Sequence, residues 1–180
     1  MGRFMNHKKW MAVIALAVTA LILTHLPVSE ADASDFQTQG STLVKYRGTE
    51  ERVTIPDTVE VVGESAFENN QKVQFVVIPK SVKRLEAYVF WGCNNLEEVV
   101  LGKGLTAVDE YSFAGCTGLK QITIPENIQS IDAQAFAGCV NLTDIYIPAT
   151  VTGIAEDAFL NCDNVTIHAD EGSVAAQFAQ

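Results

Sequence analysis

Apolar residues recur along most of the chain at a fixed spacing of 23 positions. Phenylalanine, cysteine and branched apolar residues each form a column with this step, and five units keep the register without insertion or deletion. A constant period of this length indicates a repeat array, in which each unit is one small structural module. The phenylalanine column contains Phe67, Phe90, Phe113, Phe136 and Phe159, and the cysteine column contains Cys93, Cys116, Cys139 and Cys162.

Each unit divides into two parts. The first part, exemplified by residues 96–101, ends in β-branched residues that alternate with period two, which predicts a short strand with one buried face. A proline that follows this part in most units lacks an N–H group and closes the strand. The second part has apolar residues at Val82, Leu85, Val89 and Phe90. This spacing fits either a helical turn or a second short strand, and Val61 with Val62 favours the strand in the first unit.

The predicted fold is a repeat solenoid: a right-handed array of about five units whose short parallel strands stack at ~4.8 Å. Residues at equivalent positions of successive units then stack on one another, and the five phenylalanines form one buried column. We expect the repeats to span residues 53–167, with a last strand shortened to residues 165–168. An N-terminal cap at 34–52 should contain a hairpin, and a C-terminal cap at 168–180 should contain a short helix.

Residues 1–33 are predicted to be a signal peptide. Arg3, Lys8 and Lys9 form a basic start, an apolar run follows at residues 12–23, and residues 31–33 fit the A-x-A cleavage pattern. The apolar run is shorter than the ~20 residues of a spanning helix, although an uncleaved anchor is the alternative. The mature chain should therefore begin at Ser34, lack a membrane span and be secreted or held at the cell surface.

Removal of the signal peptide makes the chain more acidic. The remaining 147 residues hold nine Lys and Arg against 20 Asp and Glu, a charge of about −11. Such a chain repels nucleic acid and anionic membranes, which argues against both as partners.

The repeat pattern resembles a known family. The consensus L-x-x-I-x-I-P-x-x-V-x-x-I-x-x-x-A-F-x-x-C-x-x-L is similar to the BspA-type (Treponema-type) leucine-rich repeats of bacterial surface and secreted proteins. The resemblance implies a leucine-rich repeat array, no cofactor and an adhesion-type role, because some relatives bind extracellular matrix proteins or host cells. The chain departs from the consensus at Gly102 in place of Pro, Asn70 in place of Cys, and Val89 and Ser112 in place of Ala.

The four cysteines of an exported chain could be disulfides, metal ligands or buried thiols. Side chains in one column point the same way, so their Cβ atoms stay ~5 Å apart, beyond the ~3.8 Å that a disulfide prefers. A straight column also cannot converge on a tetrahedral zinc ion. We predict free buried thiols, with Cys93–Cys116 or Cys139–Cys162 bridges as the alternative.

No catalytic residue or metal ligand is predicted. His168 is the only histidine after signal removal, and it is expected to be a solvated terminal residue. No nucleophile, zinc or phosphate-loop motif is present. The alternative is an enzyme like the parallel β-helix polysaccharide lyases and hydrolases, with acid–base work by Glu97, Glu98 and Asp144 beside Lys120.

Outward strand positions are the candidate binding residues. In leucine-rich repeats these strands line a concave sheet, and exposed apolar anchors in a rigid row are typical of recognition. We predict non-catalytic binding of an extracellular protein or glycan by a monomer, with Phe75, Val100 and Tyr146 as anchors; scattered surface apolar residues, a spacer and a self-associating module are the alternatives. The candidate residues are Phe75, Val77, Glu98, Val100, Gln121, Thr123, Asp144 and Tyr146.

Overall fold

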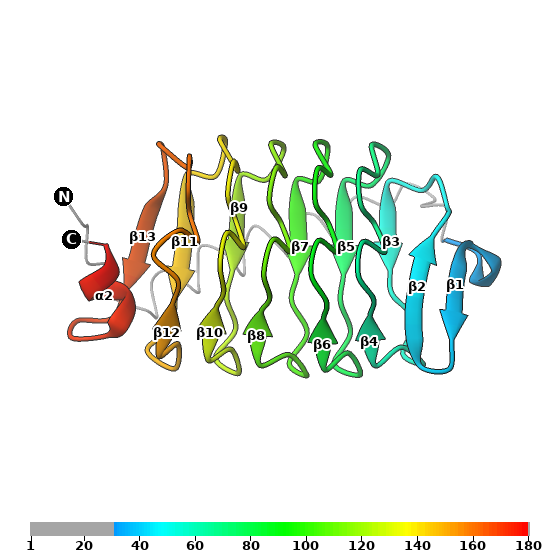
Figure 1. Ribbon diagram of the computed structural model, residues 1–180, viewed down its shortest axis with the longest axis horizontal. Helices are drawn as coiled ribbons and strands as arrows, with labels where there is room; N and C mark the ends of the chain where they lie inside the picture. Colours follow the sequence, from blue (N-terminus) through cyan, green and yellow to red (C-terminus); the bar gives the residue numbers. More distant parts are fainter. Residues whose placement is uncertain (1–30, 180) are drawn as a thin grey trace, which may run out of the picture.

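The computed structural model describes residues 31–179 as one elongated stack of coils (Figure 1). Residues 1–30 and 180 lie outside the described residues, so nearly all of the predicted signal peptide does too. Its last residues adjoin the fold: Ala31 packs against the core, and Asp32 caps the 3-10 helix η1 (Ala33–Asp35). Among residues 31–179 no helix is long and apolar enough to cross a membrane.

An antiparallel hairpin closes the N-terminal end, as predicted. It consists of β1 (Phe36–Gln39) and β2 (Thr42–Tyr46), and Gly40 takes a positive φ of 62° in the connecting turn. β2 then pairs in parallel with the first short strand, β4 (Val61–Val62). The hairpin therefore covers the open edge that the first coil would otherwise expose.

The first part of each unit forms one long strand. These strands run parallel in two sheets of three, ordered β3-β5-β7 and β9-β11-β13, so the stack has six coils rather than the predicted five. The last strand has the four residues that were predicted, shifted by one position along the chain. The strands are β3 (Arg52–Thr54), β5 (Phe75–Val77), β7 (Glu98–Val100), β9 (Gln121–Thr123), β11 (Asp144–Ile147) and β13 (Thr166–Ala169).

The second part of each unit is a two-residue strand, which decides the choice that the sequence left open. The short strands are also parallel, in the orders β2-β4-β6 and β8-β10-β12. A helical turn would interrupt this stacking, whereas an extended pair continues it at the strand spacing. Besides β4 they are β6 (Arg84–Leu85), β8 (Ala107–Val108), β10 (Ser130–Ile131) and β12 (Gly153–Ile154).

The turns that follow the short strands carry a further backbone ladder between coils. The N–H group of Phe90 donates to Ser112 O at 2.9 Å, and that of Phe113 donates to Ala135 O at 2.8 Å. One column in these turns has positive φ throughout and is filled only by Gly and Asn, the residues that tolerate this conformation. Its members are Asn69, Gly92, Gly115, Gly138 and Asn161.

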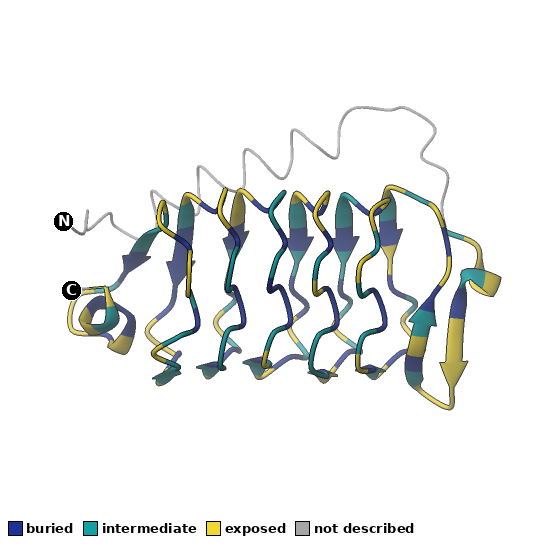
Figure 2. Cartoon of the chain, turned by 45° about the horizontal axis from the view of Figure 1, so that its top comes forward, coloured by how far each residue is buried: buried dark blue, intermediate teal, exposed yellow. Residues whose placement is uncertain are grey.

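The core is one continuous cluster of buried apolar residues that runs the length of the stack. Figure 2 shows buried and exposed stretches alternating along each coil. The predicted phenylalanine column is present, with ring centroids 4.9–5.5 Å apart from Phe67 to Phe159. Its last member is only half-buried, because the C-terminal cap covers it incompletely. Aromatic rings of the caps lengthen the column to Phe36 and Tyr46 at one end and Phe178 at the other.

The four cysteines are free and buried, as predicted. Each thiol donates to the carbonyl oxygen of the phenylalanine one coil earlier, at 3.0–3.1 Å, as Cys116 does to Phe90. Burial raises the pKa of every one of these thiols, that of Cys93 to about 12. The cysteine column is therefore a second line of hydrogen bonds along the core rather than a reactive or metal-binding feature.

A short helix, α2 (Val174–Phe178), ends the chain within the predicted cap, with Ser173 as its N-cap. The prediction for His168 is wrong. Its side chain is buried, and Nε2 lies 2.8 Å from Asp144 Oδ1, so β13 is joined to β11 by an ion pair when the imidazole is protonated.

Candidate binding surface

The outward side chains of the long strands form two straight rows, which we call the strand face. Between the rows lies a buried row that includes Val76 and Val99. Strand pairing places Phe75 beside Glu98 and Val77 beside Val100 in one sheet. In the other sheet it places Gln121 beside Asp144 and Thr123 beside Tyr146. All eight predicted residues therefore share this surface, although the two groups belong to different sheets.

The sheet is interrupted in the middle of the strand face. β7 and β9 are consecutive long strands, but neither sheet contains both, and the short strands β6 and β8 are separated at the same level. The turn before this break holds Gly102, where other units have proline. A Cβ atom on Gly102 would lie 2.3 Å from Pro79 O, so the chain passes close against the preceding coil here.

One recess, of about 230 Å³, lies at the start of the strands on both sides of the break. The Arg52 guanidinium stacks over the Phe75 ring at 4.3 Å from its centroid, so this predicted anchor is partly covered. Burial raises the pKa of Glu98, and Arg52 opposes that shift. The recess is lined by Arg52, Gln74, Phe75, Glu97, Glu98, Lys120 and Gln121.

A larger recess of about 560 Å³ lies at the other end of the strands, also beside the break. The Asn127 amide donates to Gly102 O and Leu105 O, so it joins the two sides of the interruption. The volume falls within the ~300–1,000 Å³ of typical ligand pockets. Its lining consists of Lys103, Thr123, Ile124, Pro125, Glu126, Asn127 and Tyr146.

Tyr146 is not the exposed anchor that the sequence predicted. Only 3% of its surface is accessible, and its hydroxyl donates to Asp170 Oδ2 at 3.1 Å. Burial, with the neighbouring Asp170, raises the pKa of Tyr146. The alternation of the strand placed Tyr146 outward, but the chain that follows β13 folds over this position. Tyr146 therefore holds the C-terminal cap in place and shows only an edge to the larger recess.

A comparison with protein families finds the same number of repeats as the structure has coils. A family model described as the BspA type leucine rich repeat region matches residues 45–166 in six copies. The chain belongs to the BspA-type leucine-rich repeat family. Comparison with curated protein sequences finds no match.

Solved structures of bacterial leucine-rich repeat proteins resemble this one over most of its length. A leucine rich cell surface protein of Faecalibacterium prausnitzii is 35% identical, with a TM-score of 0.72 over 77% of this chain. A leucine-rich repeat protein of T. pallidum is 27% identical, with a TM-score of 0.73 over 76%. The alignments cover 37% and 69% of those two proteins respectively, so this chain spans about a third of the first.

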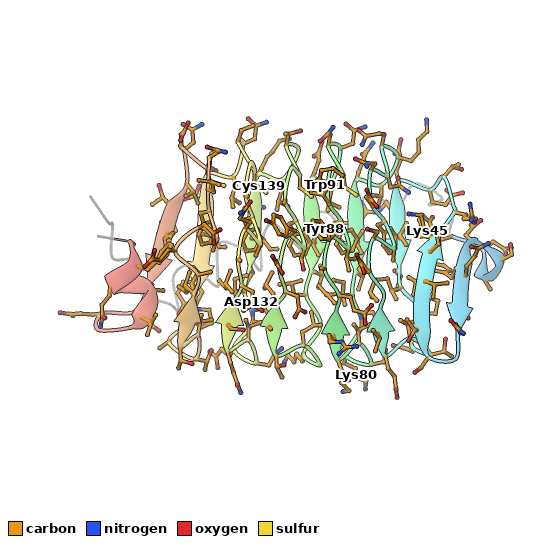
Figure 3. The ribbon with its side chains drawn as sticks, in the orientation of Figure 1. Lys45, Lys80, Tyr88, Trp91, Asp132 and Cys139 are labelled. Atoms are coloured by element: carbon orange, nitrogen blue, oxygen red, sulfur yellow. The ribbon has the colours of Figure 1, made fainter. Side chains whose placement is uncertain are left out.

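The sequence reading of this BspA-type array missed an aromatic cluster on the turns. The rings of Tyr88 and Tyr111 are stacked 4.7 Å apart at 10°, and the Trp91 ring stands edge-on to Tyr88 at 6.3 Å (Figure 3). Trp91 is 41% exposed. The available signal was two tyrosines exactly one period apart, in a column that begins with Ser65. Among residues 31–179 no group of His, Cys, Asp and Glu could hold a metal ion.

Proposed function

We propose that this chain is a secreted or cell-surface module that recognises an extracellular protein or glycan through its strand face, without catalysis. The repeat family supports a recognition role, and the similar F. prausnitzii structure is of a cell surface protein. The observation that carries the proposal is the interruption between β7 and β9, because both recesses of the strand face lie beside it.

Rigidity makes such recesses suitable for binding. Stacked strands hold Phe75, Val77 and Val100 at fixed positions, so little conformational entropy is lost when a partner docks. The two valines are neighbours in the register and are half-exposed, which gives a short apolar ridge beside the recesses. Apolar contacts flanked by polar groups are the usual anatomy of a recognition site.

Charge pairing favours a neutral or mixed partner over a strongly basic one. The Glu97 carboxylate lies 3.5 Å from Lys120 Nζ, and the Asp144 carboxylate lies 2.8 Å from His168. The same pairing supports a non-catalytic role, because two of the three carboxylates considered for acid–base work, those of Glu97 and Asp144, are engaged with basic groups. A glycoside hydrolase typically needs two carboxyl groups facing one glycosidic bond.

The test is a binding screen of the full chain against immobilised extracellular matrix proteins and neutral glycans. For any partner found, Thr123→Arg should fill the larger recess, and Phe75→Ala should remove the anchor of the smaller one. Each is expected to weaken binding at least tenfold, whereas Gln37→Ala on the hairpin, as the matched surface control, should leave it unchanged. Thermal midpoints report whether each variant is folded. Parent-like binding by both variants would exclude the strand face as the site.

A further inference from the structure

Acidic residues predominate on a second surface of the stack, away from the strand face. We define the turn face as the five turns at residues 63–71, 86–94, 109–117, 132–140 and 155–163. These turns contain nine Asp and Glu and no Lys, Arg or His, while the mature chain holds nine Lys and Arg elsewhere. Arg84 pairs with Glu86 and the Lys45 ammonium reaches Ser65 O, but the turns keep an excess of negative charge, which attracts cationic groups.

The aromatic cluster lies within this acidic surface. Tyr88 and Tyr111 present two stacked rings, and Glu64 and Glu110 are exposed at the neighbouring positions. The pKa of Tyr88 is raised by desolvation and then by Tyr111, Glu110 and Glu64, which places these carboxylates near its hydroxyl. Aromatic faces beside carboxylates form a favourable setting for a cation, because both the ring quadrupole and the charges attract it.

Both tyrosines hold a backbone conformation that their side chains disfavour. Their φ angles are 61° and 54°, in the left-handed region that Gly and Asn adopt most easily. Ser65 and Gln134 share this conformation in the same column, so the turn requires it whichever residue stands there. The tyrosines are therefore not selected by the backbone, and a role for their rings is the simpler explanation.

A lysine of this chain already occupies the equivalent position in the first turn. Lys45 Nζ donates to Ser65 O at 2.8 Å, and the same oxygen accepts the Glu68 N–H. The carbonyl oxygens of Tyr88 and Tyr111 accept the matching N–H groups of the following turns, from Trp91 and Ala114. A carbonyl oxygen accepts two hydrogen bonds, so the carbonyl oxygens of Tyr88 and Tyr111 have the same acceptor capacity that Lys45 uses at Ser65.

We propose that the turn face around Tyr88 and Tyr111 docks a lysine- or arginine-rich segment of a partner protein. Its cationic side chains stack on the tyrosine rings beside Glu64 and Glu110, and they donate to backbone carbonyl oxygens of the turns as Lys45 donates to Ser65 O. Arginine is the better occupant, because its planar guanidinium stacks on aromatic faces and donates in several directions. This surface is separate from the strand face and does not depend on the function proposed for it.

The probe is a fluorescent deca-arginine peptide, with decalysine and a Gly-Ser decapeptide for comparison, measured by anisotropy with the full chain at 150 mM salt. We expect deca-arginine to bind at least threefold more tightly than decalysine and the Gly-Ser peptide not to bind. The double variant Tyr88→Asn, Tyr111→Asn should weaken deca-arginine at least tenfold. Asparagine tolerates positive φ, so the turns are kept while the rings are removed.

Charge variants separate stacking from general attraction. Glu64→Gln with Glu110→Gln should weaken binding about three- to tenfold, whereas Glu97→Gln, which removes one carboxylate of the strand face, should have no effect. Unchanged binding by the double tyrosine variant would overturn the proposal. So would tighter binding of a neutral glycan, cellohexaose, than of deca-arginine. A dimer seen by ultracentrifugation and lost in the tyrosine variant would assign the surface to a second copy instead.

Discussion

The turn face and the strand sides, by which we mean the sheets of long strands and of short strands, hold the same coils together in different ways. On the turn face the backbone ladder passes every coil junction, including the one where the strands separate, because the Phe90 N–H group donates to Ser112 O. The Cys116 thiol adds a hydrogen bond to Phe90 O across the same junction. On the strand sides both ladders stop at this junction, between β6 and β8 and between β7 and β9. One side is thus continuous and the other is divided into two blocks.

This difference separates stability from the capacity to bind. The turn face holds the phenylalanine and cysteine columns, whose stacking and thiol hydrogen bonds repeat at every step. The strand face can lose one junction because the turn face retains it, and the lost pairing leaves the two recesses. Each coil contacts only its neighbours in a solenoid, so a local irregularity of this kind does not spread along the array.

The largest effect should come from the continuous side. Phe113 stacks between Phe90 and Phe136 at 5.4 and 5.5 Å and is fully buried, so Phe113→Ala should lower the free energy of unfolding by ~3–5 kcal/mol. Urea denaturation followed by circular dichroism measures this free energy for the parent and the variant. Phe159→Ala is the control from the half-buried end of the column and should cost clearly less. Equal costs would mean that the column is not the main source of stability.

A second variant examines the coil that borders the interruption, at its contact with the preceding coil. Gly102→Ala places a Cβ atom 2.3 Å from Pro79 O, and because backbone cannot move as easily as a side chain, we expect a loss of ~1–3 kcal/mol. Gly153→Ala is the matched control, since its Cβ would meet nothing nearer than Ser130 Cβ at 3.8 Å. A loss for Gly102→Ala no greater than that of the control would show that the paired coils of β5 and β7 can move apart here to admit a side chain.

The period of 23 was sufficient to predict the fold, because equal spacing forces like residues into columns. It placed the phenylalanines and the cysteines in buried columns, and it put the candidate residues on the long strands, although Tyr146 is buried there. It could not predict the sixth coil, whose first residues lack the consensus, as Glu50 stands where later units have leucine. It also could not show that the long strands divide into two sheets instead of one, since Gly102 is the only departure from the consensus in the turn after β7.

Side-chain environment was the weaker part of the sequence reading. Period-two alternation assigned Tyr146 to the outward row, yet residues after β13 cover it, and Asp170 accepts its hydrogen bond. His168 is buried for the same reason, because it stands beside Tyr146 in the register. The aromatic cluster at Tyr88 and Tyr111 was not predicted. A spacing of 23 positions places two tyrosines on adjacent coils, but it does not show whether their rings stack at the surface or enter the core.

A smaller, stabilising change concerns a buried hydroxyl on the continuous side. Ser112 is fully buried, and its Oγ has no hydrogen-bond partner among residues 31–179. The same column holds Ala66, Ala135 and Ala158, so Ser112→Ala should fit and raise the free energy of unfolding by ~1 kcal/mol. Ser130→Ala, at a half-buried serine, should change it little. Destabilisation by Ser112→Ala would indicate that the hydroxyl has a partner at this site.

The smallest effect is a pH dependence at the edge of the interruption, where Asp109 follows β8. Burial, and next the charge of Asp132, raise the pKa of Asp109 to about 6, while Arg84 opposes this shift. The folded state therefore binds a proton between about pH 6 and pH 4 that the unfolded state does not, and stability should increase as the pH falls from 7 to 5. Because Asp109 is half-exposed and solvent screens it, we expect about 1 kcal/mol or less.

Asp109→Asn separates this contribution from those of other groups. The amide oxygen can still accept the hydrogen bond that the carboxylate receives from the Leu85 backbone, but it carries no charge. The variant should be more stable than the parent at pH 7, and its gain between pH 7 and pH 5 should be smaller, as measured by urea denaturation at both values. Asp163→Asn, at an exposed carboxylate of the turn face, should retain the parent's gain. If Asp109→Asn retains it as well, the carboxyl group at the break is as well solvated as any on the surface, and the broken junction admits water more freely than the continuous ladder beside it.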